Sequence, residues 1–359
     1  MGRLALACAL FVTFPDAHPD AAPAPDARAP LLIGFYDGWD PGARRGLGRR
    51  LGSMDVFAPK WITVRGASAQ VVVEPDQDVP ALIRSLPRPP RVFPLISNAH
   101  DAIWDQPAAQ ALIFGHAAAQ SAFAARLVEL ARANGYGGYV FDLEGLSPQA
   151  LAGYPALLAA LKAALAPAGR EVWVTASVGA EQPSPALSAA ADAVVLMAYD
   201  ECWAGATPGP IAGEDWVAAV LASRMLQLDP RRVILGLGSY GYDWPEGGRA
   251  SPLGVGQAVA LAARVGATIR RDPSSGNETF AYASGDGARH QVWFADARAF
   301  AAGARIAAGY GVRGLAVWRI GLEDPAIWRT PRASFRGSAK PRARPDAPLP
   351  HPCGPLPAR

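Results

Sequence analysis

Eight short apolar runs, most of them separated by longer stretches with helical spacing, are the feature that most limits how this chain can fold. Continuous apolar runs between helices are typical of parallel strands that are buried on both faces. Eight of them within about 290 residues predict an α/β fold, a (β/α)8 TIM barrel, rather than an open doubly wound sheet. The absence of G-x-G-x-x-G after the first run disfavours a dinucleotide-binding fold. The runs are LLIGFYD (31–37), VFAPKWITV (56–64), RVFPLISN (91–98), GGYVFDLEG (137–145), EVWVTASVG (171–179), AVVLMAYD (193–200), RVILGLGSYG (232–241) and GLAVWRIG (314–321).

The stretches between the runs predict helices and one insertion. Residues 120–135 and 147–169 are rich in Ala and Leu at helical spacing, and the second stretch has a Ser cap at Ser147. Between the seventh and eighth runs, at about 245–290, a helical stretch precedes two apolar-polar runs that flank a Gly/Asp turn at 285–287. This pattern predicts a β-hairpin, and therefore a small α+β insertion that could form one wall of a groove.

The two ends of the chain differ from the predicted barrel at 31–330. Residues 4–14 are apolar, which is the length of a signal-peptide core and too short for a membrane span. We interpret 1–30 as a signal-like segment and linker and expect an exported protein: periplasmic, secreted or anchored facing outside. The alternatives are a misassigned start and a truncated anchor. Residues 331–359 are rich in Pro and Arg, and we predict that they are disordered.

Charge and composition exclude several classes of function. The net charge is +3, and the C-terminal tail accounts for it with six basic residues against one acid. The rest of the chain therefore has no excess of positive charge of the kind that nucleic-acid-binding proteins show. The three cysteines have no metal-binding or disulfide pattern, and we expect neither Cys8 nor Cys353 to shape the core. The five histidines are scattered without a ligand pair, so we expect no metal and no cofactor. We expect a monomer.

Two carboxylates lie inside the fourth apolar run, where an isolated buried charge would cost several kcal/mol. Asp142 and Glu144 are two residues apart, so they share one face of a strand with Val140. We predict that this face points into the barrel and that the acids end the strand at its mouth, where barrel chemistry takes place. The alternative is a pair that is salt-bridged or caps a helix. The residues predicted to face the helices are Tyr139, Phe141 and Leu143.

Acids and aromatic residues also gather where other predicted strands end. Aromatic faces stack on sugar rings, and carboxylates that flank a glycosidic bond act as acid and nucleophile. Each aromatic alone could be a core residue, but their joint placement at one face of the barrel favours a carbohydrate site. These residues are Tyr36 and Asp37 after the first strand, Tyr199 and Asp200 after the sixth, Tyr240, Tyr242, Asp243 and Trp244 after the seventh, and Trp318, Arg319, Glu323 and Asp324 on and after the eighth.

With these motifs the chain resembles the family 18 glycoside hydrolases over about residues 31–328. The family's fourth-strand signature, D-G-x-D-x-D-x-E, is similar to GGYVFDLE at 137–144. MAYD at 197–200 is similar to its M-x-Y-D. LGSYGYDW, HQVWFADARAF and GLAVWRIGLEDPAIW resemble later segments of bacterial members, especially the spore-cortex-lytic and polysaccharide-synthase-associated subgroups.

The resemblance implies a retaining, substrate-assisted reaction on an N-acetylhexosamine polysaccharide or oligosaccharide. Glu144 would be the general acid, Asp142 would orient the 2-acetamido group, and Tyr199 would donate a hydrogen bond to it. The pair on one strand is close enough for each charge to raise the pKa of the other. Further substrate-binding residues would be Asp200, Trp318, Tyr36, Tyr242 and Asn98.

The sequence departs from the family signature at two positions and leaves two functions open. Val140 replaces a carboxylate, which could shift the pH optimum or lower turnover, and Gly137 replaces the first Asp, which we interpret as a backbone requirement. The favoured function is a chitinase-like or N-acetylglucosaminidase-like hydrolase of β-1,4-linked N-acetylglucosamine polymers: chitin oligomers, peptidoglycan or an exopolysaccharide. The alternative is a lectin-like barrel that binds carbohydrate without cleaving it.

Overall fold

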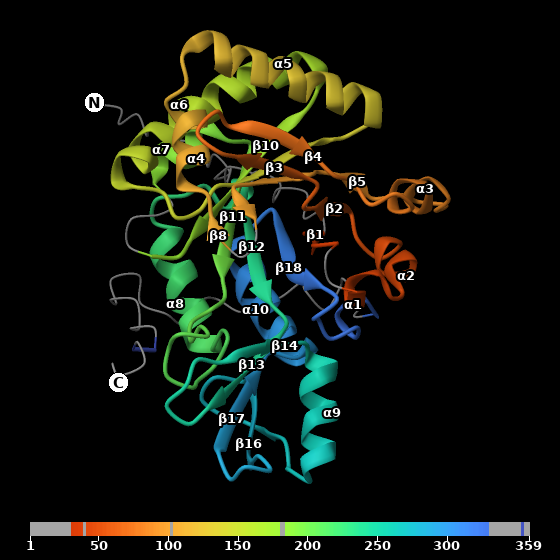
Figure 1. Cartoon of the computed structure of the whole chain (residues 1–359), viewed down its shortest axis with the longest axis vertical. Helices are drawn as coiled ribbons and strands as arrows, with labels where there is room; N and C mark the ends of the chain where they lie inside the picture. Colours follow the sequence, from red (N-terminus) through yellow and green to blue (C-terminus); the bar gives the residue numbers. More distant parts are fainter. Residues whose placement is uncertain (1–29, 39–40, 101–102, 180–183, 330–352, 355–359) are drawn as a thin grey trace, which may run out of the picture.

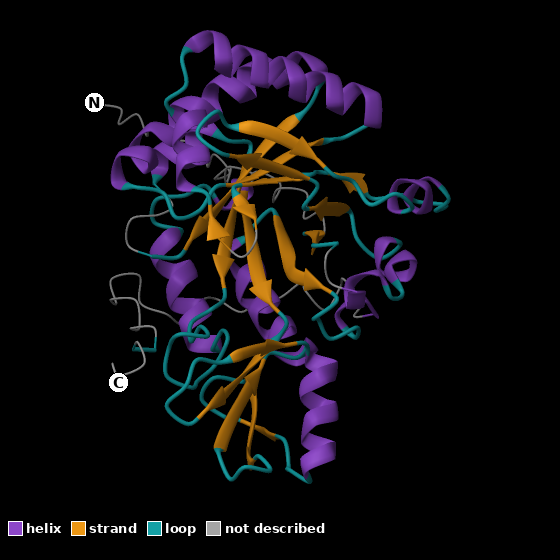
Figure 2. Ribbon diagram, viewed as in Figure 1, coloured by secondary structure: helices purple, strands orange, loops and turns teal. Residues whose placement is uncertain are grey.

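The computed structural model describes residues 30–38, 41–100, 103–179, 184–329 and 353–354. Residues 1–29 of the predicted signal-like segment at 1–30, and most of the predicted disordered tail, lie outside these ranges. Figure 1 labels the elements, and Figure 2 shows central strands covered by helices, with a smaller group of strands below them.

Eight strand positions form the central sheet, and each of them coincides with one of the eight apolar runs. They are β1 (Leu31–Tyr36), β2 (Val56–Pro59) continued by β3 (Ile62–Arg65), β5 (Arg91–Val92) continued by β6 (Leu95–Ser97), β9 (Gly138–Asp142), β10 (Glu171–Ser177), β11 (Ala193–Ala198), β12 (Val233–Gly238) and β18 (Gly314–Ile320).

The sheet closes on itself through two interrupted strands. β1 pairs in parallel with β18 on one side and β2 on the other, and β2 pairs with β5. β6 begins after only two intervening residues and pairs with β9. The strand formed by β5 and β6 therefore contacts β2 at one end of the sheet and β9 at the other, and this closes the barrel. The predicted (β/α)8 barrel is confirmed.

Helices surround this barrel on its outside (Figure 2). The longer ones are α4 (Gln106–Ile113), α5 (Ala117–Asn134), α6 (Pro148–Leu165), α8 (Glu214–Arg224) and α10 (Ala297–Tyr310). Shorter elements are α1 (Pro41–Arg44), α2 (Leu47–Leu51), α3 (Val79–Arg84), α7 (Pro185–Ala190), β4 (Gln70–Val73), the hairpin β7 (Ala99–His100) and β8 (Ile103–Trp104), and the 3₁₀ turns η1 (Ala166–Ala168), η2 (Pro230–Arg232) and η3 (Ile327–Arg329).

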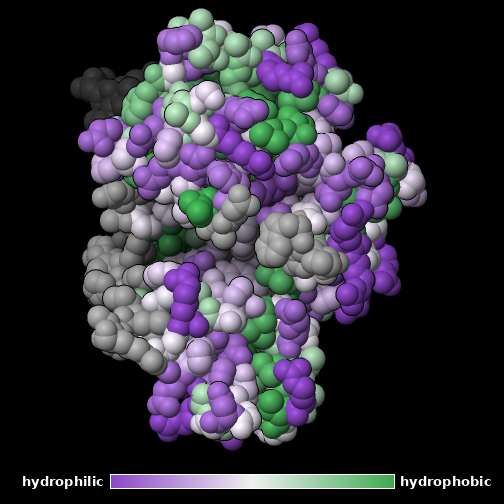
Figure 3. Space-filling model, viewed as in Figure 1, coloured by the Kyte–Doolittle hydropathy of each residue, from purple (hydrophilic) through white to green (hydrophobic). Residues whose placement is uncertain are grey.

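The caps of α6 agree with the sequence prediction. The Ser147 hydroxyl accepts a hydrogen bond from the Ala150 N–H at 3.2 Å, and Gly169 ends the helical segment in a left-handed conformation. Of the described residues, Pro148–Ala168 form one helix that is long and apolar enough to cross a membrane. This helix packs against α5, α7 and β10, and Figure 3 shows apolar side chains gathered over α5 and α6. An outer barrel helix with this packing accounts for its composition.

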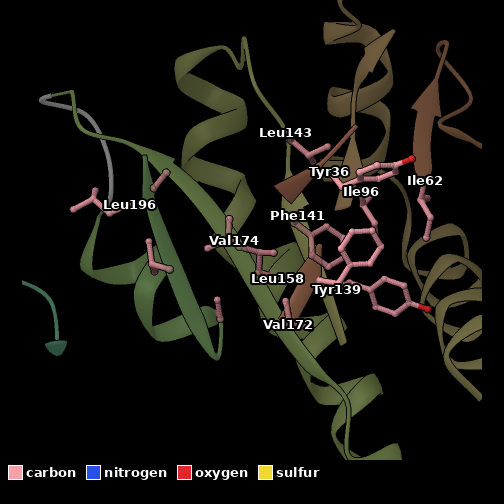
Figure 4. Packing of buried hydrophobic residues seen from close by; sticks show 14 of the residues in the cluster. Tyr36, Ile62, Ile96, Tyr139, Phe141, Leu143, Leu158, Val172, Val174 and Leu196 are labelled. Carbon is pink, nitrogen blue, oxygen red and sulfur yellow. The ribbon is translucent and has the colours of Figure 1, made fainter. Parts of the chain in front are cut away.

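Alternating side chains divide the apolar residues of the barrel into two cores. The inner core fills the barrel. The outer core, part of which is shown in Figure 4, lies between the strands and the helices. Tyr139, Phe141 and Leu143 lie in the outer core, as predicted, while Val140 lies in the inner one. Burial of each such side chain contributes about 1.5–3 kcal/mol.

The insertion is an antiparallel sheet with one helix, as predicted, but it is wider than 245–290. Its elements are β13 (Gly241–Pro245), β14 (Ser251–Leu253), α9 (Val255–Val265), β15 (Arg270–Arg271), β16 (Glu278–Ala283) and β17 (Arg289–Phe294). The hairpin prediction is confirmed by the β16–β17 pairing. The sheet begins at Gly241 because β13 follows β12 after only Ser239 and Tyr240, and it pairs with β17 as far as Phe294.

Candidate active site

Glu144 follows β9 at the mouth of the barrel, where Asn98 holds its backbone. The Asn98 side chain donates to the Glu144 carbonyl and accepts from the Glu144 N–H, both at 2.9 Å. Asn98 also donates to the Asp105 carbonyl at 3.2 Å and is fully buried. This two-point contact fixes the backbone of Glu144, while its side chain lines a cavity.

Asp142 is the last residue of β9, and its side chain is almost fully buried. The Thr175 hydroxyl on the neighbouring strand β10 donates to Asp142 Oδ1 at 2.7 Å. Thr175 lies two residues after Trp173 on β10, so the two side chains point to the same face of the strand. Trp173 lies in the inner core, and Thr175 therefore also faces the inside of the barrel. A neutral hydroxyl thus partners Asp142 from the next strand.

The layer beneath Asp142 explains why Val140 can replace a carboxylate. Val140 pairs in register with Leu95 on one side and Trp173 on the other, and all three are buried in the inner core. The Trp173 ring packs against Phe93 with centroids 4.3 Å apart. A charged group in this apolar layer would lose its hydration without gaining a partner, at a cost of several kcal/mol.

Gly137 and Gly138 provide space for the same packing. A Cβ atom on Gly137 would come within 2.6 Å of the Phe93 ring, and one on Gly138 within 2.2 Å of the Glu171 carbonyl. Neither glycine has a positive φ. We predicted a backbone requirement at Gly137; the structure shows a requirement for space instead.

Tyr199 and Trp318 form a stacked pair at the centre of the mouth. Their ring planes differ by 9°, and their ring centroids lie 6.0 Å apart. The Phe35 ring also packs against Trp318, with the two ring centroids 5.6 Å apart. Gly238 makes room for this arrangement, because a Cβ atom there would lie 3.0 Å from the Tyr199 Cβ and 2.7 Å from the Tyr240 ring. Both rings line the cavity.

Asp200 follows directly and is held by two tyrosines from the seventh-strand region. The Tyr240 hydroxyl donates to Asp200 Oδ1 at 2.5 Å and the Tyr242 hydroxyl donates to the same oxygen at 3.0 Å. The Asp200 backbone has a φ of 59°, in the left-handed region that Asp tolerates better than most residues. These bonds hold the carboxylate at one end of the site.

A cavity of about 870 Å³ lies above these residues. Among the described residues, its wall contains acids, aromatic rings and a single amine, Lys60, from the junction of β2 and β3. The residues that line it include Phe35, Asp37, Lys60, Trp104, Asp142, Glu144, Thr175, Tyr199, Asp200, Trp203, Trp318 and Cys353. This volume suits a small organic ligand or part of a polymer.

The electrostatics of the cavity favour the neutral form of its acids. Burial, followed by the nearby Asp142 and Asp200 carboxylates, raises the pKa of Glu144 to about 8. Burial also raises the pKa of Asp142, against the lowering effects of the Thr175 hydroxyl and the Lys60 ammonium. A carboxyl group that stays protonated near neutral pH can donate a proton to a leaving oxygen.

Five of the eight predicted site residues line the cavity together: Glu144, Asp142, Tyr199, Asp200 and Trp318. Asn98 and Tyr242 lie behind the wall and position Glu144 and Asp200 instead of facing the cavity. The predicted role of Tyr36 is wrong: its ring lies in the outer core against Phe57, because alternation along β1 turns Phe35 and Asp37 inward.

The expectation of no disulfide is also wrong. Cys202, in the loop after β11, bonds to Cys353, which lines the cavity. A separation of 151 residues leaves no local spacing from which the pair could be read. Disulfides persist in oxidising compartments, so this bond points to a location outside a reducing cytosol.

The sequence interpretation also missed Thr175, Lys60, Trp104 and Trp203. The available signal for Thr175 was a polar residue at an inward position of an apolar strand. Lys60 lies between β2 and β3 and Trp104 lies in β8, at places that the sequence analysis did not assign to the mouth, whereas Trp203 lies three residues beyond Asp200. Within the described residues, no group of three His, Cys, Asp or Glu side chains is arranged to hold a metal ion.

An eight-stranded barrel with buried carboxylic acids and aromatic rings at its mouth has the architecture of a glycoside hydrolase. The sequence model of glycosyl hydrolases family 18 matches residues 104–323, and the chain belongs to that family. It is therefore a glycoside hydrolase.

Solved structures and curated proteins agree with this assignment. A chitinase from Chromobacterium violaceum is 28% identical with a TM-score of 0.76, covering 88% of this chain and all of that one. The cortical fragment-lytic enzyme of Bacillus anthracis is 29% identical over 233 residues, which are 61% of this chain and 54% of that protein. The chain thus spans about half the length of that relative. A spore cortex-lytic enzyme of Bacillus megaterium shares the fold at 21% identity, with a TM-score of 0.75 over 86% of this chain and 75% of that one.

Proposed function

We propose that the chain hydrolyses β-1,4-linked polysaccharide that contains N-acetylglucosamine, with retention of configuration and with assistance from the substrate's own acetamido group. The observation that carries this proposal is the position of Glu144 on the cavity wall beside the buried Asp142, where burial and the neighbouring carboxylates raise the pKa of Glu144 to about 8. The names of the relatives, a chitinase and a cortical fragment-lytic enzyme, support the substrate class.

In the proposed reaction, the glycosidic oxygen takes the Glu144 proton as its bond to the anomeric carbon breaks. The acetamido oxygen attacks that carbon from the other side and forms an oxazolinium ion. Asp142 accepts a hydrogen bond from the acetamido N–H and stabilises the positive charge, while the Tyr199 hydroxyl donates to the acetamido oxygen. Water, deprotonated by Glu144, then opens the ring.

The remaining wall residues have binding roles in this proposal. The stacked rings of Trp318 and Tyr199 form an apolar surface beneath the sugar and its acetamido methyl group. Asp200, fixed by two tyrosine hydroxyls, accepts hydrogen bonds from sugar hydroxyls. The export of the chain is part of the same proposal, because the polymer lies outside the cell and the disulfide is suited to that compartment.

Turnover against a panel of polymers tests the proposal. We expect cleavage of chitin oligomers or of peptidoglycan glycan strands, and no cleavage of cello-oligosaccharides, which have a hydroxyl in place of the acetamido group. Reducing-end release and mass spectrometry of the products measure this. Cleavage of cello-oligosaccharides at a comparable rate would contradict the mechanism. Binding of acetamido sugars without cleavage at any pH would favour the lectin-like alternative.

The pH dependence of kcat/KM should have a basic limb near pH 8. Glu144 must be protonated to act as an acid, and its pKa is raised to about 8, so activity falls as pH rises through this value. The Asp200→Asn variant removes a carboxylate that helps to raise this pKa, so its basic limb should move to lower pH. Initial rates between pH 4 and 10 measure the basic limb of the wild type and that of the variant. A wild-type basic limb near pH 5 would exclude Glu144 as the acid.

A further inference from the structure

Lys60 lies between β2 and β3, and its side chain points into the mouth of the barrel. Ala58 and Val56, two and four positions earlier, both lie in the inner core, so alternation along β2 turns Lys60 to the same face. Its backbone is held against β1, because the Lys60 N–H donates to the Tyr36 carbonyl at 2.9 Å. The side chain therefore reaches the wall of the catalytic cavity from a fixed backbone.

Only one strand separates Lys60 from the strand that carries Asp142. β3 continues the chain after Lys60 and pairs with β6, and β6 in turn pairs with β9. Ser97 of β6 lies in register with Asp142. Because neighbouring strands lie about 4.8 Å apart, one intervening strand leaves about 10 Å between the two backbones, and the long lysine side chain spans much of this distance. The ammonium is therefore within electrostatic reach of Asp142.

Lys60 brings a positive charge to a wall that is otherwise acidic. Among the described residues that line the cavity it is the only cation, and four carboxyl groups share the wall with it: Asp37, Asp142, Glu144 and Asp200. The ammonium lies 3.6 Å from an Asp37 carboxylate oxygen, which makes an ion pair too long for a hydrogen bond. Coulomb attraction acts over longer distances than a hydrogen bond, so the ammonium also attracts the other acids.

The ammonium acts unequally on the two carboxyl groups at the end of β9. Burial raises the pKa of Asp142, whereas the Thr175 hydroxyl and the Lys60 ammonium lower it. The pKa of Glu144 is raised to about 8 by burial and then by the Asp142 and Asp200 carboxylates, and all of these effects act in the same direction. Two acids this close resist carrying two charges, so the first charge is more stable on Asp142.

The remaining titratable groups around Asp142 add no positive charge. Burial, followed by the charge of Asp142 itself, raises the pKa of Tyr154 on α6 and of Tyr199 well above the usual range, so both hydroxyls stay neutral. Burial also raises the pKa of Asp200, which repels a charge on Asp142 when it is ionised. Of the charged groups in the described residues around Asp142, Lys60 is therefore the one that favours its ionisation.

We propose that Lys60 is a positioning residue that gives the two carboxyl groups opposite protonation states: its ammonium stabilises the negative charge on Asp142 and so leaves the proton on Glu144. The inference rests on the proposed function, in which Asp142 stabilises a cation and Glu144 donates a proton. Because Val140 is apolar, Asp142 has no acid beneath it with which to share a proton, and its charge state depends on the cation at its side.

The pH dependence of two variants tests this role. Lys60→Met keeps the length of the side chain and removes its charge, whereas Lys60→Arg keeps the charge. Asp142 must be ionised in the proposed reaction, so activity rises as pH rises through its pKa, and removal of the ammonium raises that pKa. The acidic limb of kcat/KM should therefore move to higher pH in Lys60→Met, with a loss of about tenfold on that limb and little change in KM. Lys60→Arg should stay within a few-fold of wild type at every pH.

A control and a second measurement separate this effect from a loss of structure or of turnover. Lys162→Met is the matched control, because Lys162 on α6 forms an ion pair with Asp192 at 2.9 Å outside the cavity, and it should leave both limbs unchanged. ¹³C NMR of the Asp carboxyl carbons, with the Asp142 signal assigned by Asp142→Asn, follows the same titration without turnover and should show it at higher pH in Lys60→Met. If Lys60→Met does not fold, Lys60→Gln replaces it in both measurements.

An unmoved acidic limb together with an unmoved Asp142 titration would overturn the inference. A rise in KM alone would also overturn it, because Lys60 would then be a substrate-binding residue, and equal impairment of Lys60→Arg and Lys60→Met would show that packing matters and charge does not. If the wild-type protein cleaves no acetamido polymer while the NMR titration still moves in Lys60→Met, the proposed function is rejected and the assignment of the charge to Asp142 by Lys60 is upheld.

Discussion

Replacing Glu144 by Gln should reduce kcat on a chitin oligomer by about a hundredfold to ten-thousandfold, because general acid catalysis contributes about 10²–10⁴ and this variant removes it. Glutamine keeps the shape and the backbone contacts with Asn98 but has no acidic proton. Binding of the oligomer should therefore remain within a few-fold of wild type. Initial rates and isothermal titration on the same preparations measure the two effects.

The control is Glu129→Gln, the same exchange on the exposed face of α5, where Glu129 pairs with Arg126 at 3.4 Å. Exposed pairs of this kind contribute little to stability, so this variant should keep wild-type turnover and binding. A Glu144→Gln protein that retains more than a tenth of wild-type kcat would exclude Glu144 as the general acid. Loss of both binding and turnover would instead indicate a structural defect.

Strand alternation was the reliable guide from sequence to site. It correctly predicted that the side chains of Tyr139 and Phe141 point toward the helices and that Val140 points into the barrel, because each barrel strand has one face toward each core. Applied to β1, the same rule would have excluded Tyr36 and selected Phe35 and Asp37. The error at Tyr36 came from grouping aromatic residues near a strand end without assigning each to a face.

Contacts between distant segments could not be predicted in this way. The role of Asn98 depends on β6 lying beside β9, so that an amide 46 residues away reaches the Glu144 backbone. The disulfide depends on the path of the chain around the whole barrel. The space required at Gly137 depends on the Phe93 ring from the neighbouring strand.

Val140 illustrates how such a contact changes the interpretation of a motif. The sequence showed only that a carboxylate was missing beneath Asp142. In the structure, Trp173 and Leu95 flank Val140 in a dry layer, and Thr175 partners Asp142 from the side. The acid that we propose to orient the acetamido group thus has a neutral hydroxyl as its neighbour in place of a second carboxylate.

Participation of the substrate's acetamido group is the central claim, and it should produce a large effect of fluorine on rate. Fluorine atoms on the acetyl methyl group withdraw electrons from the carbonyl oxygen and weaken its attack on the anomeric carbon. The charge that Asp142 stabilises in the oxazolinium ion also becomes costlier to form. Steric size changes little, so binding to the Trp318 surface should be affected far less than the chemical step.

The most direct test measures kcat/KM for aryl β-chitobiosides whose reacting acetamido group carries zero, one, two or three fluorines. We expect a stepwise fall with each fluorine, amounting to at least about tenfold across the series, or about 1.4 kcal/mol in the activation free energy. A rate that is independent of fluorine number would contradict substrate assistance and would indicate that an enzyme carboxylate, with Asp142 as the first candidate, attacks the sugar directly.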